Sequence, residues 1–159
     1  MHANEELISR FYSAFQRRDA AAMASCYHAD VTFSDPAFPE LRGDRARGMW
    51  AMLCERGSDL ELEFGDVRAD DKSGSAHWEA RYTFSATGKK VHNVIEARFE
   101  FRDGLIARHT DSFDFRRWAG QALGVPGRLF GGTGFLRRKV QGLGAKALDE
   151  YLADHGKPV

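Results

Sequence analysis

The middle of the chain, residues 59–115, contains four long segments in which apolar and polar residues alternate, and this pattern limits the possible folds most strongly. Alternation with a period of two places the apolar side chains on one face of a strand. Short turn sequences at 70–74, 87–90 and 102–104 separate the segments, so neighbouring strands are predicted to form antiparallel hairpins. The alternation shifts by one residue at Gly65, which indicates a bulge. The predicted strands are residues 59–69, 76–85, 91–101 and 105–115.

Helices are predicted before this run of strands. Apolar residues recur three and four apart in the first segment, and an alanine-rich stretch beginning at Asp19 and including Tyr27 forms the second helix. A short strand at 31–34 then leads to Asp35 and Pro36. Helices followed by a meander of strands indicate an α+β fold, in which one strongly curved antiparallel sheet wraps around the helices. The predicted helices are residues 4–18, 19–27 and 45–56.

The order helix, helix, strand and Asp-Pro resembles the start of the ketosteroid isomerases and the SnoaL-like polyketide cyclases of the nuclear transport factor 2-like superfamily. The resemblance covers residues 4–124 and implies a cystatin-like cone. Helical spacing beyond it predicts a C-terminal helical extension. In the isomerases this segment carries an oxyanion-hole tyrosine and a general-base aspartate, and Tyr12 and Asp35 fall on those positions. The cyclases use an aspartate of the late sheet as a general acid/base, a role that the resemblance implies for Asp111.

The sequence departs from the isomerases at one position. They carry a second oxyanion-hole acid on the penultimate strand, where this chain has Ala97. Loss of such a donor typically lowers the rate by on the order of 10²-fold or more. A cyclase or a related isomerase therefore fits the sequence better than a true ketosteroid isomerase.

Polar residues also interrupt the predicted apolar face of the sheet. His109 and Asp111 lie two residues apart on one strand and are predicted to point the same way. An imidazole and a carboxylate so placed could pass a proton to a substrate, or they could simply satisfy one another. Asp35 could likewise be a turn residue, and Tyr12 a core aromatic residue.

Weighing these alternatives, we predict cofactor-free proton transfer on a small apolar carbonyl compound, by isomerisation or cyclisation. Asp111 and Asp35 would be the acid/base residues, His109 would orient Asp111, and Tyr12 would donate to the developing oxyanion. Asn93 could be a second donor. The predicted ligand-binding residues are Phe33, Trp78, Tyr82, Asn93 and Phe113. A non-catalytic small-molecule-binding or dimerisation module of the same fold is the alternative.

Composition excludes several other classes. The 159 residues contain six histidines and two cysteines without the paired spacing of metal ligands, and Cys26 and Cys54 fit reduced buried thiols. No glycine-rich phosphate loop follows a strand, so neither a metal nor a cofactor is predicted. The start of the sequence lacks the pattern of a signal peptide, and the expected location is cytoplasmic.

The C-terminal region differs in charge from the rest of the chain. Residues 116–159 contain 8 Lys and Arg against 3 Asp and Glu. We predict a domain at 1–124 followed by a basic amphipathic tail at 125–159, which could alternatively bind a partner as a scaffold. The apolar stripe of this tail has three interpretations. Packing on the parent domain comes first, contact with a dimer partner or a role as a ligand-gating lid comes second, and binding to a membrane surface comes last. We expect a homodimer, no nucleic acid and no membrane partner. The stripe comprises Leu136, Val140, Leu143, Ala147 and Tyr151.

Overall fold

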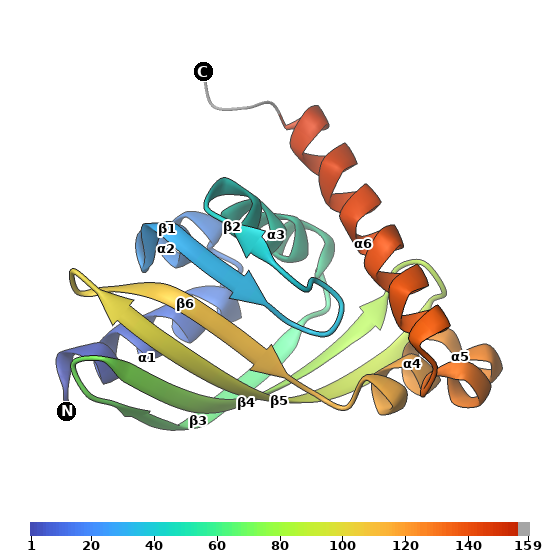
Figure 1. Cartoon of the computed structure of the whole chain (residues 1–159), viewed down its shortest axis with the longest axis horizontal. Helices are drawn as coiled ribbons and strands as arrows, with labels where there is room; N and C mark the ends of the chain where they lie inside the picture. Colours follow the sequence, from blue (N-terminus) through green and yellow to red (C-terminus); the bar gives the residue numbers. More distant parts are fainter. Residues whose placement is uncertain (156–159) are drawn as a thin grey trace.

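The computed structural model describes residues 1–155, and residues 156–159 of the predicted tail lie outside this described part. A six-stranded sheet curves around the N-terminal helices, with strand order β2-β1-β6-β5-β4-β3 (Figure 1). The strands are β1 (Tyr27–Ser34), β2 (Leu41–Arg42), β3 (Glu61–Ala69), β4 (Ser73–Phe84), β5 (Lys89–Arg102) and β6 (Leu105–Ser112). The helices are α1 (Ala3–Gln16), α2 (Ala20–Ser25), α3 (Asp44–Arg56), α4 (Phe115–Leu123), α5 (Val125–Phe130) and α6 (Gly134–Asp154).

The predicted α+β cone is confirmed, with one change in strand direction. The predicted bulge is present, because the β3–β4 register shifts between Gly65 and Arg68. The sheet is mixed rather than wholly antiparallel, since β1 runs parallel to β6 and aligns Phe33 with His109. Alternation within a strand fixes which face is buried, but it carries no information on the direction of a neighbour reached through a long connection. The parallel pair brings the end of β1 beside the polar residues of β6.

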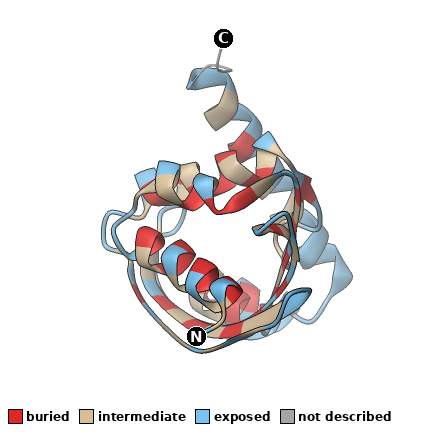
Figure 2. Cartoon of the chain, turned by 90° about the vertical axis from the view of Figure 1, so that its left-hand side faces the viewer, coloured by how far each residue is buried: buried red, intermediate tan, exposed pale blue. Residues whose placement is uncertain are grey.

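Helix α1 lies inside the curve of the sheet and buries one face there (Figure 2). Its first turn is closed by a capping box of His2 and Glu5. Asn4 is buried, and its side chain donates to the backbone oxygen of Asp70 at 3.0 Å. The helix is thereby fixed to the β3–β4 turn. Its buried apolar residues are Leu7, Ile8, Phe11, Tyr12, Ala14 and Phe15.

Strand β1 begins earlier than the sequence pattern indicated. The predicted second helix included Tyr27, but α2 ends at Ser25 and Tyr27 is the first residue of β1. The backbone N–H of Ile106 donates to the carbonyl of Cys26 at 2.9 Å, so pairing with β6 ends the helix there. Tertiary pairing thus outweighs the local helical spacing. Tyr27 consequently faces the interior of the cone.

Helix α6 crosses the open end of the cone and packs against α3 (Figure 1). Leu148 is fully buried, and Gly48 on α3 leaves room for the side chain of Leu152. The Gln141 side chain donates to the backbone oxygen of Pro36 at 3.1 Å, which ties α6 to the loop after β1. Most of the apolar stripe therefore packs on the parent domain, although Leu143 is exposed. The division at residue 124 stays a prediction.

Candidate active site

An imidazole and a carboxylate lie side by side on the concave face of the sheet. His109 and Asp111 project inward from β6, and His109 Nε2 lies 2.9 Å from Asp111 Oδ1. Their side chains are 0 and 3% exposed. A buried charge or polar group is stable only with partners, and here each provides one for the other. Spacing on a single strand is therefore enough to bring these two predicted residues together.

A chain of hydrogen bonds extends from this pair into the core. Tyr27 Oη lies 2.8 Å from His109 Nδ1, and the indole N–H of Trp50 donates to Tyr27 Oη at 2.7 Å. With neutral His109, the tyrosine hydroxyl donates to Nδ1, which leaves the proton on Nε2 facing Asp111. The Trp50 ring also stacks on the imidazole, with centroids 5.8 Å apart and an interplanar angle of 12°. The core thus fixes the orientation of His109 through two residues that sequence reasoning missed.

The sequence pattern places Tyr27 on a helix, so its pairing with β6 was not predicted. Helical spacing predicts the helix at 45–56 that contains Trp50, but it carries no information on the partner of the indole N–H. A buried Tyr and a buried Trp each carry one polar atom that needs a hydrogen bond. This need for a hydrogen-bond partner was the signal in the sequence that pointed to Tyr27 and Trp50.

Tyr12 is a second buried tyrosine, and it interacts electrostatically with Asp111. Its hydroxyl is the buried side-chain polar atom without a hydrogen-bond partner among residues 1–155. Burial raises the pKa of Tyr12 well above its ordinary value, and the nearby Asp111 carboxylate raises it further. The indole N–H of Trp78 makes a long contact of 3.5 Å with Asp111 Oδ1. Asp111 also aligns directly with Ala97 on β5, so a carboxyl group stands one strand away from the position that the isomerases use.

Asp35 lies at the end of β1, where it organises its own loop. Its Oδ1 accepts hydrogen bonds from the backbone N–H groups of Ala37 at 2.7 Å and Phe38 at 2.6 Å. Desolvation raises the pKa of Asp35 to about 7, although the hydrogen bond from Phe38 opposes this, and the Asp111 carboxylate raises the pKa further. Asp35 is therefore both a turn residue and a group that exchanges protons near neutral pH.

The predicted ligand-binding residues occupy different environments. Phe33 is fully buried against the rings of Trp50 and His109, so it is a core residue in this structure. Tyr82 accepts a hydrogen bond from the indole of Trp118 at 2.8 Å, and burial raises its pKa to about 12. Phe113, like Tyr82, packs against two groups of buried apolar residues. One is the main core that includes α1, and the other is a smaller group formed by β5 and α4. Asn93 is buried on the inward face of β5.

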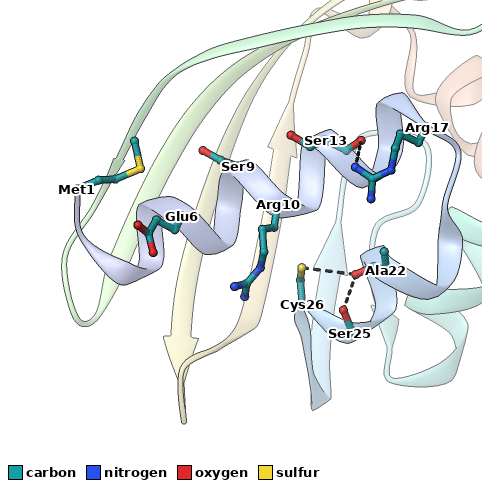
Figure 3. Close-up of a pocket in the computed structure, with 9 residues that line it drawn as sticks. All are labelled: Met1, Glu6, Ser9, Arg10, Ser13, Arg17, Ala22, Ser25 and Cys26. Atoms are coloured by element: carbon teal, nitrogen blue, oxygen red, sulfur yellow. Dashed lines mark hydrogen bonds between the residues drawn. The ribbon is translucent and has the colours of Figure 1, made fainter.

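The site is closed in this structure. Two hollows of about 410 and 740 Å³ lie elsewhere, the first outside α1 and α2 (Figure 3) and the second at the β3–β4 end of the sheet. None of the predicted site residues lines either hollow. Helix α6 and the loop after β1 cover the end of the cone at which Asp35 lies. Within residues 1–155, no three His, Cys, Asp or Glu side chains are grouped as metal ligands would be.

The family can now be stated from comparison with known proteins. The sequence profile of the SnoaL-like domain matches residues 8–109. This chain belongs to the SnoaL-like domain family. The match contains Tyr12, Asp35 and His109, whereas Asp111 and helices α4 to α6 lie beyond it. No protein of curated function matched the chain.

Solved structures show the same fold in this SnoaL-like protein and several relatives. A proposed polyketide cyclase from Xanthomonas campestris is 25% identical, with a TM-score of 0.59 over 73% of this chain and 93% of its own. An epoxide hydrolase from M. tuberculosis is 18% identical, with a TM-score of 0.64 over 80% and 95%. A protein with a ketosteroid isomerase-like fold from Catenulispora acidiphila, in complex with trimethylamine, is 14% identical, with a TM-score of 0.66 over 77% and 95%.

These relatives span nearly their own full length but leave a fifth or more of the SnoaL-like protein unmatched. Structures named as cyclases, isomerases and hydrolases share the fold, so the fold alone does not specify a reaction. No helix among residues 1–155 is long and apolar enough to cross a membrane. The specific chemistry has to be argued from the site.

Proposed function

We propose that this SnoaL-like protein catalyses cofactor-free proton transfer next to the carbonyl of a small apolar compound, by isomerisation or by aldol-type cyclisation. The observation that carries the proposal is the unpartnered hydroxyl of Tyr12 beside the buried Asp111 carboxylate. A buried hydroxyl without a partner is costly, and such groups occur where a ligand supplies the missing bond. A carbonyl oxygen is an acceptor that fits this donor.

The reaction would use Asp111 as the base. Its Oδ1 contacts His109 and Trp78, and no hydrogen bond among residues 1–155 reaches its Oδ2. Oδ2 would take the proton from the carbon next to the carbonyl, and the C–H electron pair would move to form an enolate. The developing negative oxygen would accept a hydrogen bond from Tyr12. Returning the proton from Asp111 to another carbon gives an isomer. Attack of the enolate carbon on a second carbonyl instead closes a ring, and the resulting alkoxide takes the proton from Asp111.

His109 would keep the carboxylate oriented, because the Trp50–Tyr27 chain fixes the imidazole. Asp35, with its pKa of about 7, would exchange the proton with the medium at the mouth of the cone. Entry of the substrate requires movement of α6 or of the loop after β1, since Tyr12, His109 and Asp111 are buried in the closed form. Gating of this kind is common in enzymes that exclude water.

A thermal-shift screen followed by turnover assays tests the proposal. Wild type, Asp111→Asn and the exposed control Glu61→Gln would be tested with polycyclic ketones and aromatic polyketides. A ligand at about 100 times its Kd adds roughly 2.7 kcal/mol to the stability of the protein that it binds. We expect one ketone class to stabilise wild type and the control, and Asp111→Asn to lower turnover of that class by about 10²-fold or more.

Three results would contradict the proposal. If no ketone stabilises the wild type, the interior is not a site for this class of compound. If ketones bind and Asp111→Asn turns them over as fast as wild type, Asp111 is not the base. If ketones bind but no protein turns them over, the chain is a binding module.

A further inference from the structure

Exposed large apolar side chains gather in one part of the molecule. Apart from Met1, those found among residues 1–155 all lie on α5 and the first half of α6, with 54 to 70% of each residue exposed. Large apolar residues in such numbers over a short segment usually mark an interaction surface. We name this set the apolar patch; its members are Val125, Leu129, Phe130, Phe135 and Leu143.

The charge around the apolar patch has a single sign. Residues 115–146 contain seven Lys and Arg and no Asp or Glu. All seven side chains are exposed, and no ion pair within the described residues involves any of them. On α6, Arg138, Lys139 and Lys146 recur at helical spacing with Phe135, on the face opposite the buried Leu148. The basic residues are Arg116, Arg117, Arg128, Arg137, Arg138, Lys139 and Lys146.

A second copy of the chain does not fit this surface. Contact between two such segments would pair the apolar patches, but it would also bring two purely basic surfaces together, which is unfavourable. Contact with the rest of another copy would supply acidic residues, but residues 2–124 present no exposed large apolar side chain to receive the phenylalanines. Contact between two patches would therefore cover the apolar side chains but not neutralise the charge. Contact with the rest of another copy would neutralise the charge but not cover the apolar side chains.

An anionic lipid bilayer satisfies both properties at once. We infer that α5 and the first half of α6 dock on an anionic membrane surface, with the apolar patch entering the boundary between headgroups and acyl chains. Basic residues beside aromatic and leucine side chains are typical of helices that lie in this interface. The sequence pattern of the tail, in which the stripe of α6 stands out, predicted no membrane partner. Most of that stripe packs on the domain, and apart from Leu143 the apolar patch consists of other residues. This inference is independent of the proposed catalysis.

Vesicle co-sedimentation of the full chain tests the inference. Vesicles of phosphatidylcholine with an equal part of phosphatidylglycerol would be compared with vesicles of phosphatidylcholine alone. We expect binding to the anionic vesicles that weakens as salt is added, and little binding to the neutral ones. A basic residue near an anionic surface contributes about 1 kcal/mol, so Arg138→Gln with Lys139→Gln should lower the partition coefficient about 25-fold.

Matched variants separate this surface from general charge effects. Arg68→Gln with Arg98→Gln removes two exposed arginines from β3 and β5, and this pair should reduce binding much less. Phe130→Ser with Phe135→Ser should abolish binding while leaving the melting temperature near that of wild type, since both rings are exposed. Equal effects of the two arginine pairs, or no binding of wild type to anionic vesicles, would overturn the inference. So would a dimer in sedimentation that the two serine substitutions convert to monomer, because a second copy would then cover the patch.

Discussion

At the scale of single residues, two buried tyrosines show how partners determine the role of a side chain. Tyr12 and Tyr27 are both almost fully buried, and burial raises the pKa of each well above its ordinary value. Tyr27 lies between the indole of Trp50 and the imidazole of His109, whereas the Tyr12 hydroxyl has no partner among residues 1–155. The first hydroxyl therefore stabilises the fold, and the second is available to a ligand.

Removal of each hydroxyl should have opposite consequences for stability. Tyr27→Phe leaves the Trp50 N–H and His109 Nδ1 without their partner and should lower the free energy of unfolding by about 1–3 kcal/mol. Tyr12→Phe removes an unpaired polar atom and should leave stability unchanged or higher. Urea unfolding of both variants measures the difference. Equal losses of stability would mean that Tyr12 has a partner that the structure does not show, such as a buried water.

Asp35 should make stability depend on pH in the opposite sense to a paired carboxylate. Its pKa is about 7 in the folded chain, against about 4 when unfolded, so the folded chain binds more protons between these values. This contribution to stability is therefore greatest below pH 4, falls as the pH rises to about 7, and is constant above that.

Asp35→Asn isolates the effect, because the amide oxygen can still accept the hydrogen bonds of Ala37 and Phe38. Urea unfolding at several pH values should show wild type losing stability relative to Asp35→Asn between about pH 4 and pH 7. Asp35→Ala should be less stable than Asp35→Asn at every pH, since it also loses the loop hydrogen bonds. A difference between wild type and Asp35→Asn that does not vary with pH would show that the carboxyl group is solvated.

At the scale of elements, glycines decide how closely the C-terminal helices approach one another. A Cβ atom at Gly127 would lie 1.8 Å from the backbone oxygen of Ala119, so α5 packs on α4 only because residue 127 has no side chain. Gly142, by contrast, has no atom within 4 Å of the position of a Cβ. The first glycine is needed for packing, and the second only weakens α6.

Alanine substitutions at these two glycines should differ in sign. Gly127→Ala should displace α5 and lower the free energy of unfolding by about 1–3 kcal/mol. Gly142→Ala should raise it by roughly 0.5–1 kcal/mol, because alanine favours a helix interior. Thermal or urea unfolding measures both. Two losses of similar size would show that α6 tolerates no added side chain at residue 142, contrary to the open space found there.

At the scale of the whole molecule, the sequence predicted the elements well and their neighbours less well. Alternation identified the strands of the meander and the faces that they bury, including the inward direction of His109 and Asp111. It could not reveal that β1 pairs in parallel with β6, because pairing partners leave no mark in the period of either strand. Tyr27 was placed on a helix for the same reason, and the hydrogen-bond chain to His109 was lost with it.

The tail shows the same limit. Its helical spacing correctly indicated a packed stripe, but spacing cannot tell which of two apolar faces the domain covers. Exposure of Phe130 and Phe135 follows from the way α5 and α6 dock, and it became visible only in the folded molecule. The catalytic or binding roles of the site residues stay predictions, to be decided by the substitutions described above.

The parallel pairing of β1 with β6 also bears on when the site forms during folding. The two residues joined by the Tyr27–His109 hydrogen bond lie 82 positions apart in the chain. The hairpins between β3 and β6 can close by short-range contacts, but this bond requires the beginning and the end of the sheet to meet, and such long-range closure is slow. We therefore expect Asp35 and the Tyr27–His109 bond to join His109 and Asp111 on the concave face in a late step of folding, so that a chain trapped with only its hairpins formed would lack the complete site.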